Sequence, residues 1–179
     1  MVGLGGTGAA TVQRLRGFGC DVIGVRAHPE RGGPDGLERV VGPAQLPEVA
    51  GDADVLVLCA LFEPGAPPLV DAKLLDAVQP GLVLVNVARG GLLDEPALLD
   101  ALEDGRIGAA GLDGFAHEPV DPQAPLVTHP NVIALPHVAG VTEQMFRQAG
   151  RVFADELERW RRHEPPRFAV NEPSRPRGW

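Results

Sequence analysis

A glycine-rich turn at the start of the chain, Gly3-Leu-Gly5-Gly6-Thr7-Gly8, constrains the fold more than any other feature of the sequence. In its G-x-G-x-x-G spacing the first glycine permits a tight turn, the second lets a pyrophosphate approach the backbone, and the third lets a helix pack on a strand. A helical pattern and then an apolar strand pattern follow it, as a dinucleotide-binding site requires. The strand that should precede it is reduced to Met1 and Val2, so we expect a truncated first strand. The motif predicts that the cofactor-binding residues include Gly3, Gly5, Gly6, Thr7 and Gly8.

Short, nearly continuous apolar runs recur along the chain and alternate with amphipathic segments. Such runs are typical of parallel strands that are covered on both faces, and their alternation with helices predicts an α/β fold. We expect strands at 21–26, 54–59, 81–87, 108–113 and 131–135, and helices at 9–18, 73–78, 95–103 and 142–163. The sequence thus predicts a Rossmann-like, doubly wound parallel sheet in a dinucleotide-binding domain at 1–163, followed by a tail at 164–179.

Composition excludes several classes of function. The net charge of −8 gives the chain no electrostatic reason to bind nucleic acid or an anionic membrane. No apolar run approaches the roughly 20 residues of a membrane span, and no basic region precedes the glycines as in a signal peptide. The two cysteines, Cys20 and Cys59, have neither metal-ligand spacing nor a disulfide pattern. We therefore expect a cytoplasmic protein without a metal site.

The end of the second predicted strand bears on which dinucleotide would bind. An Asp or Glu there would bind the ribose 2′-hydroxyl of NAD, whereas an arginine can pair with the 2′-phosphate of NADP. This chain has Arg26 at that point, with His28 and Arg31 nearby. A solvated arginine at a strand end is the alternative interpretation. The sequence favours NADP(H) over NAD(H).

Arg89, Glu118 and His137 each lie in a segment that follows a predicted strand. In an open α/β sheet the ligand crevice lies beyond the carboxyl ends of the strands, so we expect these three side chains there. An arginine fork suits a carboxylate and a neighbouring carbonyl, and a histidine can exchange a proton with a developing alkoxide. A carboxylate beside the histidine favours its protonated form and fixes its orientation. This chemistry fits the reduction of a 2-keto acid.

The same segments carry a resemblance to a known family. N-x-A-R-G-G-L-L-D-E begins at Asn86, G-L-D-x-F-x-x-E-P at Gly111, and P-H-x-A-G-x-T at Pro136. Together with the glycine turn, and in this order, they resemble the D-isomer-specific 2-hydroxyacid dehydrogenases over residues 1–171. The resemblance implies an oxidoreductase with a Rossmann-like domain, and a homodimer built through that domain.

The resemblance also implies roles for the catalytic candidates. Arg89 would orient the substrate, Glu118 would be the carboxylate partner, and His137 would be the acid and base. The competing interpretations are a surface arginine, an ordinary Glu-Pro turn and a buried histidine, with His117 as a rival base.

Further residues are implied to line the cofactor. Asp113 would contact the nicotinamide carboxamide, and Val87, Ala88 and the loop around Gly140 would line that end. Family members usually have Leu-Pro-Leu-Thr along the cofactor, where this chain has Cys59-Ala60-Leu61-Phe62. Ala60 and Leu61 would still line the cofactor, and Phe62 is expected to crowd the adenosine side or to remove one hydrogen bond.

The leading functional hypothesis is an oxidoreductase domain that transfers a hydride between NAD(P)H and a small 2-keto acid such as glyoxylate or hydroxypyruvate. Family members carry a substrate domain ahead of the glycine turn, so we expect this chain to be incomplete as given and its tail to return to that domain. The alternative is a non-catalytic NAD(P)-binding or dimerisation module. A third interpretation is a fragment that starts at a misplaced start codon, which in-frame coding sequence upstream of Met1 would establish.

Overall fold

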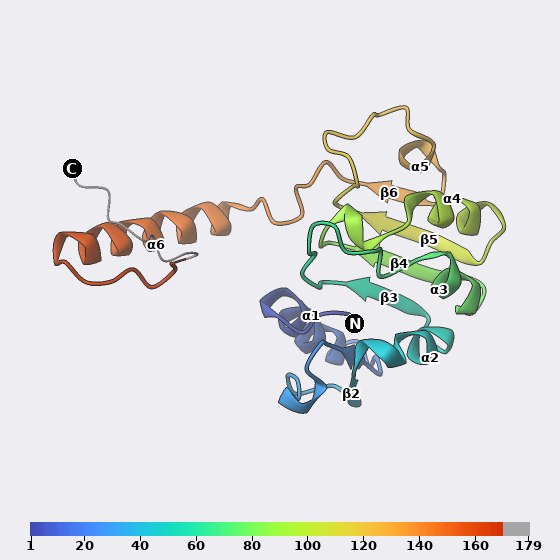
Figure 1. Ribbon diagram of the computed structural model, residues 1–179, viewed down its shortest axis with the longest axis horizontal. Helices are drawn as coiled ribbons and strands as arrows, with labels where there is room; N and C mark the ends of the chain where they lie inside the picture. The colour runs from blue at the N-terminus through green and yellow to red at the C-terminus, as the bar shows by residue number, and fades with distance from the viewer. Residues whose placement is uncertain (170–179) are drawn as a thin grey trace. The chain divides into compact units, whose positions relative to one another are not determined.

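The computed structural model describes residues 1–169, which divide into a first unit, Met1–Val138, and a second unit that begins at Ala139 (Figure 1). The first unit contains the parallel strands and most of the helices, and the second contains one long helix. The predicted tail at 164–179 lies partly outside the described residues, and the predicted domain boundary at 163 stays a prediction.

The first unit is built on parallel strands in the order expected of a doubly wound sheet. Strands β1 (Ile23–Val25) and β2 (Arg39–Val41) form one pair, and β3 (Val55–Leu58), β4 (Leu82–Asn86), β5 (Ile107–Leu112) and β6 (Val132–Ala134) follow one another in a second group. In Figure 1 the strands of the second group are stacked with their arrowheads on the same side. Their carboxyl ends therefore share one edge of the sheet.

Val2 joins the two groups of strands. It forms parallel bridges to Val25 of β1 and to Leu58 of β3. Its N–H donates to Val57 O at 2.8 Å, and its carbonyl accepts from Cys59 N at 2.7 Å. The truncated first strand predicted from the sequence is thus a single rung at the centre of the sheet, at the point where the strand order reverses.

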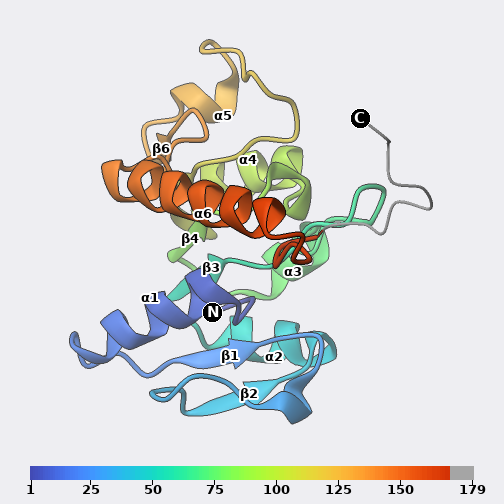
Figure 2. The same ribbon diagram turned by 90° about the vertical axis from the view of Figure 1, so that its left-hand side faces the viewer.

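Helices cover both faces of this sheet. In Figure 2, α1 (Gly6–Arg16) lies on one side of the strands, and α2 (Leu46–Gly51), α3 (Ala72–Ala77) and α4 (Glu95–Glu103) lie on the other. A carboxylate caps two of these helices, because Asp71 accepts from Leu74 N at 2.9 Å and Asp94 from Ala97 N at 3.1 Å. The α/β doubly wound fold predicted from the sequence is confirmed.

The core consists mainly of leucine and valine side chains from alternate strand positions and from the facing helices. On β4 the buried positions alternate with half-buried ones, so Leu82 and Leu84 face the core. Leu58 and Ile107 on the neighbouring strands and Leu98 on α4 are fully buried beside them. This packing fixes the strand ends that carry the candidate site.

Two short helices and one strand were not predicted from the sequence. They are β2, α2 and α5 (Pro125–Thr128). Short 3-10 turns also occur at Pro29–Arg31, Pro43–Gln45 and Gly90–Leu92. The five strands predicted from the sequence agree with β1, β3, β4, β5 and β6 to within a few residues, and α1 begins earlier than predicted, at Gly6 within the glycine turn.

The second unit contains α6 (Glu143–Arg161), which agrees with the helix predicted at 142–163. Thr142 caps it by accepting a hydrogen bond from Met145 N at 3.1 Å. None of its residues is buried, and Phe146, Phe153 and Trp160 are exposed. Within residues 1–169, neither α6 nor any other helix combines the length and the apolar character needed to cross a membrane.

Candidate active site

The glycine turn lies where the strand order reverses, and two of its glycines are required by close contacts. Gly3 has a φ of +90°, and a Cβ on it would lie 2.6 Å from Ala60 N. A Cβ on Gly8 would collide with the carbonyl oxygen of Gly3, which confirms that this glycine lets α1 pack on the strand. Gly5 is different, because nothing lies within 4 Å of the position its Cβ would take. The turn therefore leaves open space beside the first N–H groups of α1, which have no partners within the helix.

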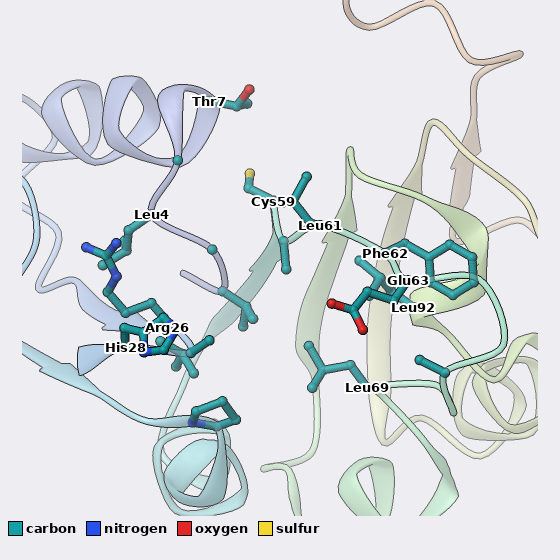
Figure 3. Close-up of a pocket in the computed structure, with 18 of the residues that line it drawn as sticks. Leu4, Thr7, Arg26, His28, Cys59, Leu61, Phe62, Glu63, Leu69 and Leu92 are labelled. Carbon is teal, nitrogen blue, oxygen red and sulfur yellow. The ribbon is translucent and has the colours of Figure 1, made fainter. Parts of the chain in front are cut away.

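A cavity of about 930 Å³ lies over this turn. Gly3, Gly5, Gly6, Thr7, Arg26, Ala60 and Leu61 are among its lining residues. Figure 3 shows Arg26 and His28 on one side of it, and Leu61, Phe62 and Leu69 on the other. A second cavity of about 370 Å³ shares Thr7, Ala60 and Leu61 with the first and extends to Val87, Ala88 and Arg89. The two cavities connect the region of Arg26 with that of Arg89, as a dinucleotide cleft would.

Arg26 is half-buried just after β1, and its guanidinium has a fixed neighbour. Nη1 donates to the carbonyl oxygen of Gly32 at 2.6 Å. The nearby His28 has its Nδ1 3.3 Å from a carboxylate oxygen of Glu30. The loop after β1 thus holds Arg26 at the rim of the cavity, in the position from which the sequence predicts that it binds a 2′-phosphate.

Phe62 is half-buried, and its ring lies against Gly91. It packs against the hydrophobic core on the side of the cavity opposite Arg26 (Figure 3). The ring therefore stands away from the end of the cleft where Arg26 lies. The expected effect of Phe62 on cofactor binding stays a prediction.

Arg89 lies in a turn directly after β4. The Asn86 side chain spans this turn, since its Oδ1 accepts from Ala88 N at 3.0 Å and its Nδ2 donates to Arg89 O at 2.8 Å. The guanidinium of Arg89 donates from Nη1 to Ala88 O at 2.7 Å. The buried Asn86 side chain thus fixes the backbone of the turn that carries Arg89.

Glu118 and His137 are in direct contact. Nδ1 of His137 lies 2.9 Å from Oε2 and 3.1 Å from Oε1 of the carboxylate. Both side chains are partly exposed, 41% for His137 and 39% for Glu118, so the pair is open to a substrate. The hydrogen bond from His137 holds the pKa of Glu118 below its ordinary value, the N–H of Phe115 and the charge of Arg89 act in the same direction, and burial opposes them.

The backbone at His137 is unusual, because its φ of +56° lies in the left-handed region that side chains other than glycine seldom adopt. The next residue fixes this conformation, since Val138 N donates to Oδ1 of Asp113 at 2.7 Å. Asp113 is itself buried, with 5% of its surface exposed. Its predicted contact with a nicotinamide carboxamide stays a prediction.

Most of the residues predicted for the site fall around one edge of the sheet. The glycine turn, Arg26, Ala60 and Leu61 line the first cavity, Val87, Ala88 and Arg89 line the second, and Glu118 contacts His137. Gly140 belongs to the second unit, so its place at the nicotinamide end stays a prediction. His117, the rival base, is exposed, and the Glu118 carboxylate bonds to His137.

Two contacts near the site were missed from the sequence. Asn86 was noted only as the first residue of a motif, although its amide bridges the turn that carries Arg89. Glu95 was noted only as the last residue of the same motif, and its Oε1 accepts from Ala116 N at 2.6 Å, in the loop that carries Glu118. A polar residue at the end of an apolar strand was the available signal for Asn86.

Comparison with known proteins identifies the family. Residues 1–139 match the family model of the D-isomer specific 2-hydroxyacid dehydrogenase, NAD binding domain. The chain belongs to this family. The resemblance seen in the sequence motifs is therefore confirmed, and the domain is of the NAD(P)-binding, Rossmann type found in these oxidoreductases.

Two relatives illustrate the range of the family. A D-3-phosphoglycerate dehydrogenase of Methanocaldococcus jannaschii is 34% identical over 178 residues, which are 98% of this chain and 33% of the relative. A hydroxyphenylpyruvate reductase of Plectranthus scutellarioides is 32% identical over 158 residues, 88% of this chain and 49% of the relative. The chain thus spans between a third and a half of the length of these dehydrogenases.

Solved structures of the family superpose well on the chain. A 2-hydroxyacid dehydrogenase of Xanthobacter autotrophicus, in complex with NADPH and MES, has a TM-score of 0.81 at 31% identity, covering 95% of this chain and 69% of that one. A D-lactate dehydrogenase of Lactobacillus jensenii, with NAD⁺, has a TM-score of 0.81 at 27% identity, covering 96% of this chain and 54% of that one. Structures with either dinucleotide are therefore similar to this chain.

Proposed function

We propose that this chain is the part of a 2-hydroxyacid dehydrogenase that binds NAD(P)H and carries the acid–base pair for reducing a small 2-keto acid. The observation that carries the proposal is the contact of 2.9 Å between Glu118 and His137, at the edge of the sheet where Arg89 also lies. A histidine held by a carboxylate, near an arginine, is the arrangement that carbonyl reduction needs.

The residues at the glycine turn fit a dinucleotide. The open space at Gly5 and the first N–H groups of α1 would hold the pyrophosphate, with Ala60 and Leu61 along the cleft and Val87 and Ala88 at the nicotinamide end. When bound, the reduced nicotinamide supplies the hydride that is added to the carbonyl carbon.

The side chains of this chain then serve binding, orientation and proton transfer. Arg89 binds the carboxylate and the adjacent carbonyl of the 2-keto acid through its guanidinium. His137 donates a proton to the developing alkoxide oxygen, and takes it back from the hydroxyl in the reverse reaction. Glu118 accepts from Nδ1 of His137, which fixes the tautomer and leaves Nε2 toward the substrate.

NADP(H) is the preferred cofactor in this proposal. Arg26, bonded to Gly32 O at 2.6 Å, presents a cation at the rim of the cavity where an NAD enzyme would have a carboxylate. A glyoxylate/hydroxypyruvate reductase of Sinorhizobium meliloti, in complex with NADP and malonate, is 34% identical to this chain with a TM-score of 0.76, and supports a small 2-keto acid such as glyoxylate or hydroxypyruvate. A cytoplasmic homodimer is part of the same proposal.

Steady-state assay of the 179-residue chain tests the proposal. NADPH oxidation is measured with glyoxylate and with hydroxypyruvate, and NADPH binding is measured by fluorescence. His137→Gln is expected to lower kcat about a hundredfold or more while NADPH still binds, because a positioned acid contributes at least that factor. The matched control is His163→Gln, at an exposed histidine after α6.

Two results would contradict the proposal. Unchanged turnover in His137→Gln would remove the acid–base assignment. Binding of NADPH by the unmodified chain with no turnover on any 2-keto acid would favour the alternative, a non-catalytic dinucleotide-binding module.

A further inference from the structure

Asn86 is the last residue of β4, and its side chain is fully buried, with 0% of its surface exposed. Both ends of its amide bond to the backbone of the following turn, at Ala88 N and Arg89 O. Its own carbonyl oxygen accepts from Asp113 N at 3.0 Å, at the end of β5. One residue thus ties the turn that carries Arg89 to two neighbouring strand ends.

The place of Asn86 in the strand makes this arrangement informative. Leu82, Leu84 and Asn86 occupy the buried positions of β4, so the alternation of the strand would place an apolar side chain at residue 86. Burying an amide in such a position is unfavourable unless its hydrogen bonds are made. Here they are made to the turn that follows, and the amide therefore serves that turn rather than the packing of the core.

We propose that Asn86 is a positioning residue for Arg89, and that it sets the direction in which the guanidinium enters the substrate end of the cleft. The inference rests on the proposed function, in which Arg89 binds the 2-keto acid. Arg89 bonds to Ala88 O at 2.7 Å, and Ala88 N is held by Asn86. The guanidinium thus bonds to the same short turn that the Asn86 side chain holds. If the turn changes conformation, the guanidinium moves as well.

The first test is local and does not depend on turnover. In Asn86→Ala the amide hydrogen of Ala88 loses its acceptor, and the amide of Leu92, which donates to Arg89 O at 3.2 Å, bonds to a carbonyl that is no longer held. Hydrogen exchange followed by NMR should become about tenfold faster at both amides, as expected for the loss of one hydrogen bond. The amides of β4 and β5 should keep their protection.

The second test separates positioning from general stability. Asn86→Ala should raise the KM for glyoxylate about tenfold and the KM for NADPH by much less, because the displaced Arg89 binds the carboxylate whereas Val87 and Ala88 meet only the nicotinamide end of the cofactor. Asn86→Asp keeps an acceptor for Ala88 N and should recover part of the loss. Leu98→Val, which opens a small cavity beneath α4, is the control for reduced stability and should leave both KM values unchanged.

The outcomes are distinct. Unchanged exchange at Ala88 and Leu92 in Asn86→Ala overturns the inference, whatever the activity. Equal losses for glyoxylate and NADPH, or the same loss in Leu98→Val, also overturn it, because they indicate a purely structural role. Absence of 2-keto acid turnover in the unmodified chain contradicts the proposed function instead, and the exchange result then still decides whether Asn86 fixes the turn.

Discussion

Replacing Arg26 by alanine tests the preference for NADP(H). The guanidinium is held by Gly32 O at 2.6 Å and lies at the rim of the cavity, so it needs little reorganisation to meet a 2′-phosphate. NADH lacks that phosphate and makes no such contact. The substitution is therefore expected to weaken NADPH binding selectively.

The size of the effect follows from the exposure of the site. A hydrogen bond to a charged group contributes about 1.5–3 kcal/mol. Arg26 is only half-buried and one of its N–H groups is already bonded to Gly32, so the lower end of that range applies. A loss of about 1.5 kcal/mol corresponds to roughly a tenfold rise in the Kd for NADPH.

Fluorescence titration with NADPH and with NADH, at one fixed ionic strength, measures both Kd values. The matched control is Arg14→Ala, which removes the same charge from the exposed end of α1, where Arg14 bonds to Ala10 O at 2.7 Å. Its Kd values should equal those of the unmodified chain. An equal rise for both dinucleotides in Arg26→Ala, or none for NADPH, would refute the assignment of Arg26 to the 2′-phosphate.

Other consequences of the structure can be checked directly. Gly8→Ala places a Cβ against the carbonyl oxygen of Gly3 and should lower the free energy of unfolding, measured in urea titrations, by about 1–3 kcal/mol. Gly5→Ala adds a Cβ that has nothing within 4 Å, so it should leave the free energy of unfolding unchanged and weaken only NADPH binding. Equal stability of the two variants would contradict this. Because the pKa of Glu118 is lowered in the folded state by His137, its stabilisation is present above its unfolded pKa, near 4.5, and is lost as pH falls through the lower folded value. At pH 7 the free energy of unfolding of the unmodified chain should therefore exceed that of Glu118→Gln by up to about 1 kcal/mol, a small value because the pair is partly exposed. The difference should vanish in acid. A difference that persists at pH 2 would show that the carboxylate is not responsible.

The strands were predictable where the sequence supplies a long apolar run. β4 extends over Leu82–Asn86, and its continuous hydrophobicity marks a strand buried on both faces. β2 has only three residues, Arg39–Val41, directly before Gly42 and Pro43, and too short a run for any periodicity to be seen. α2 likewise has six residues and a proline in its first turn.

The site was predictable as a set of residues and not as a geometry. Glu118 and His137 could be placed at one edge because their strands were expected to be parallel, and the observed contact of 2.9 Å agrees with that placement. The left-handed backbone of His137 could not be foreseen, because it depends on a hydrogen bond to Asp113, a residue far away in the sequence. Side-chain bonds of this kind depend on the packed fold and leave no periodic signal.

The position of Val2 between two groups of strands couples ligand binding to the stability of the folded domain. Val2 bonds the β1–β2 pair to the strands from β3 onward, and the cleft lies over the same seam, with Arg26 on one side and Leu61 on the other. A dinucleotide in the cleft would contact both groups of strands and so stabilise their association, in addition to the hydrogen bonds of Val2. At a concentration one hundred times its Kd, such a ligand stabilises the folded state by about 2.7 kcal/mol, and the melting temperature of this domain should therefore report the cofactor that it prefers.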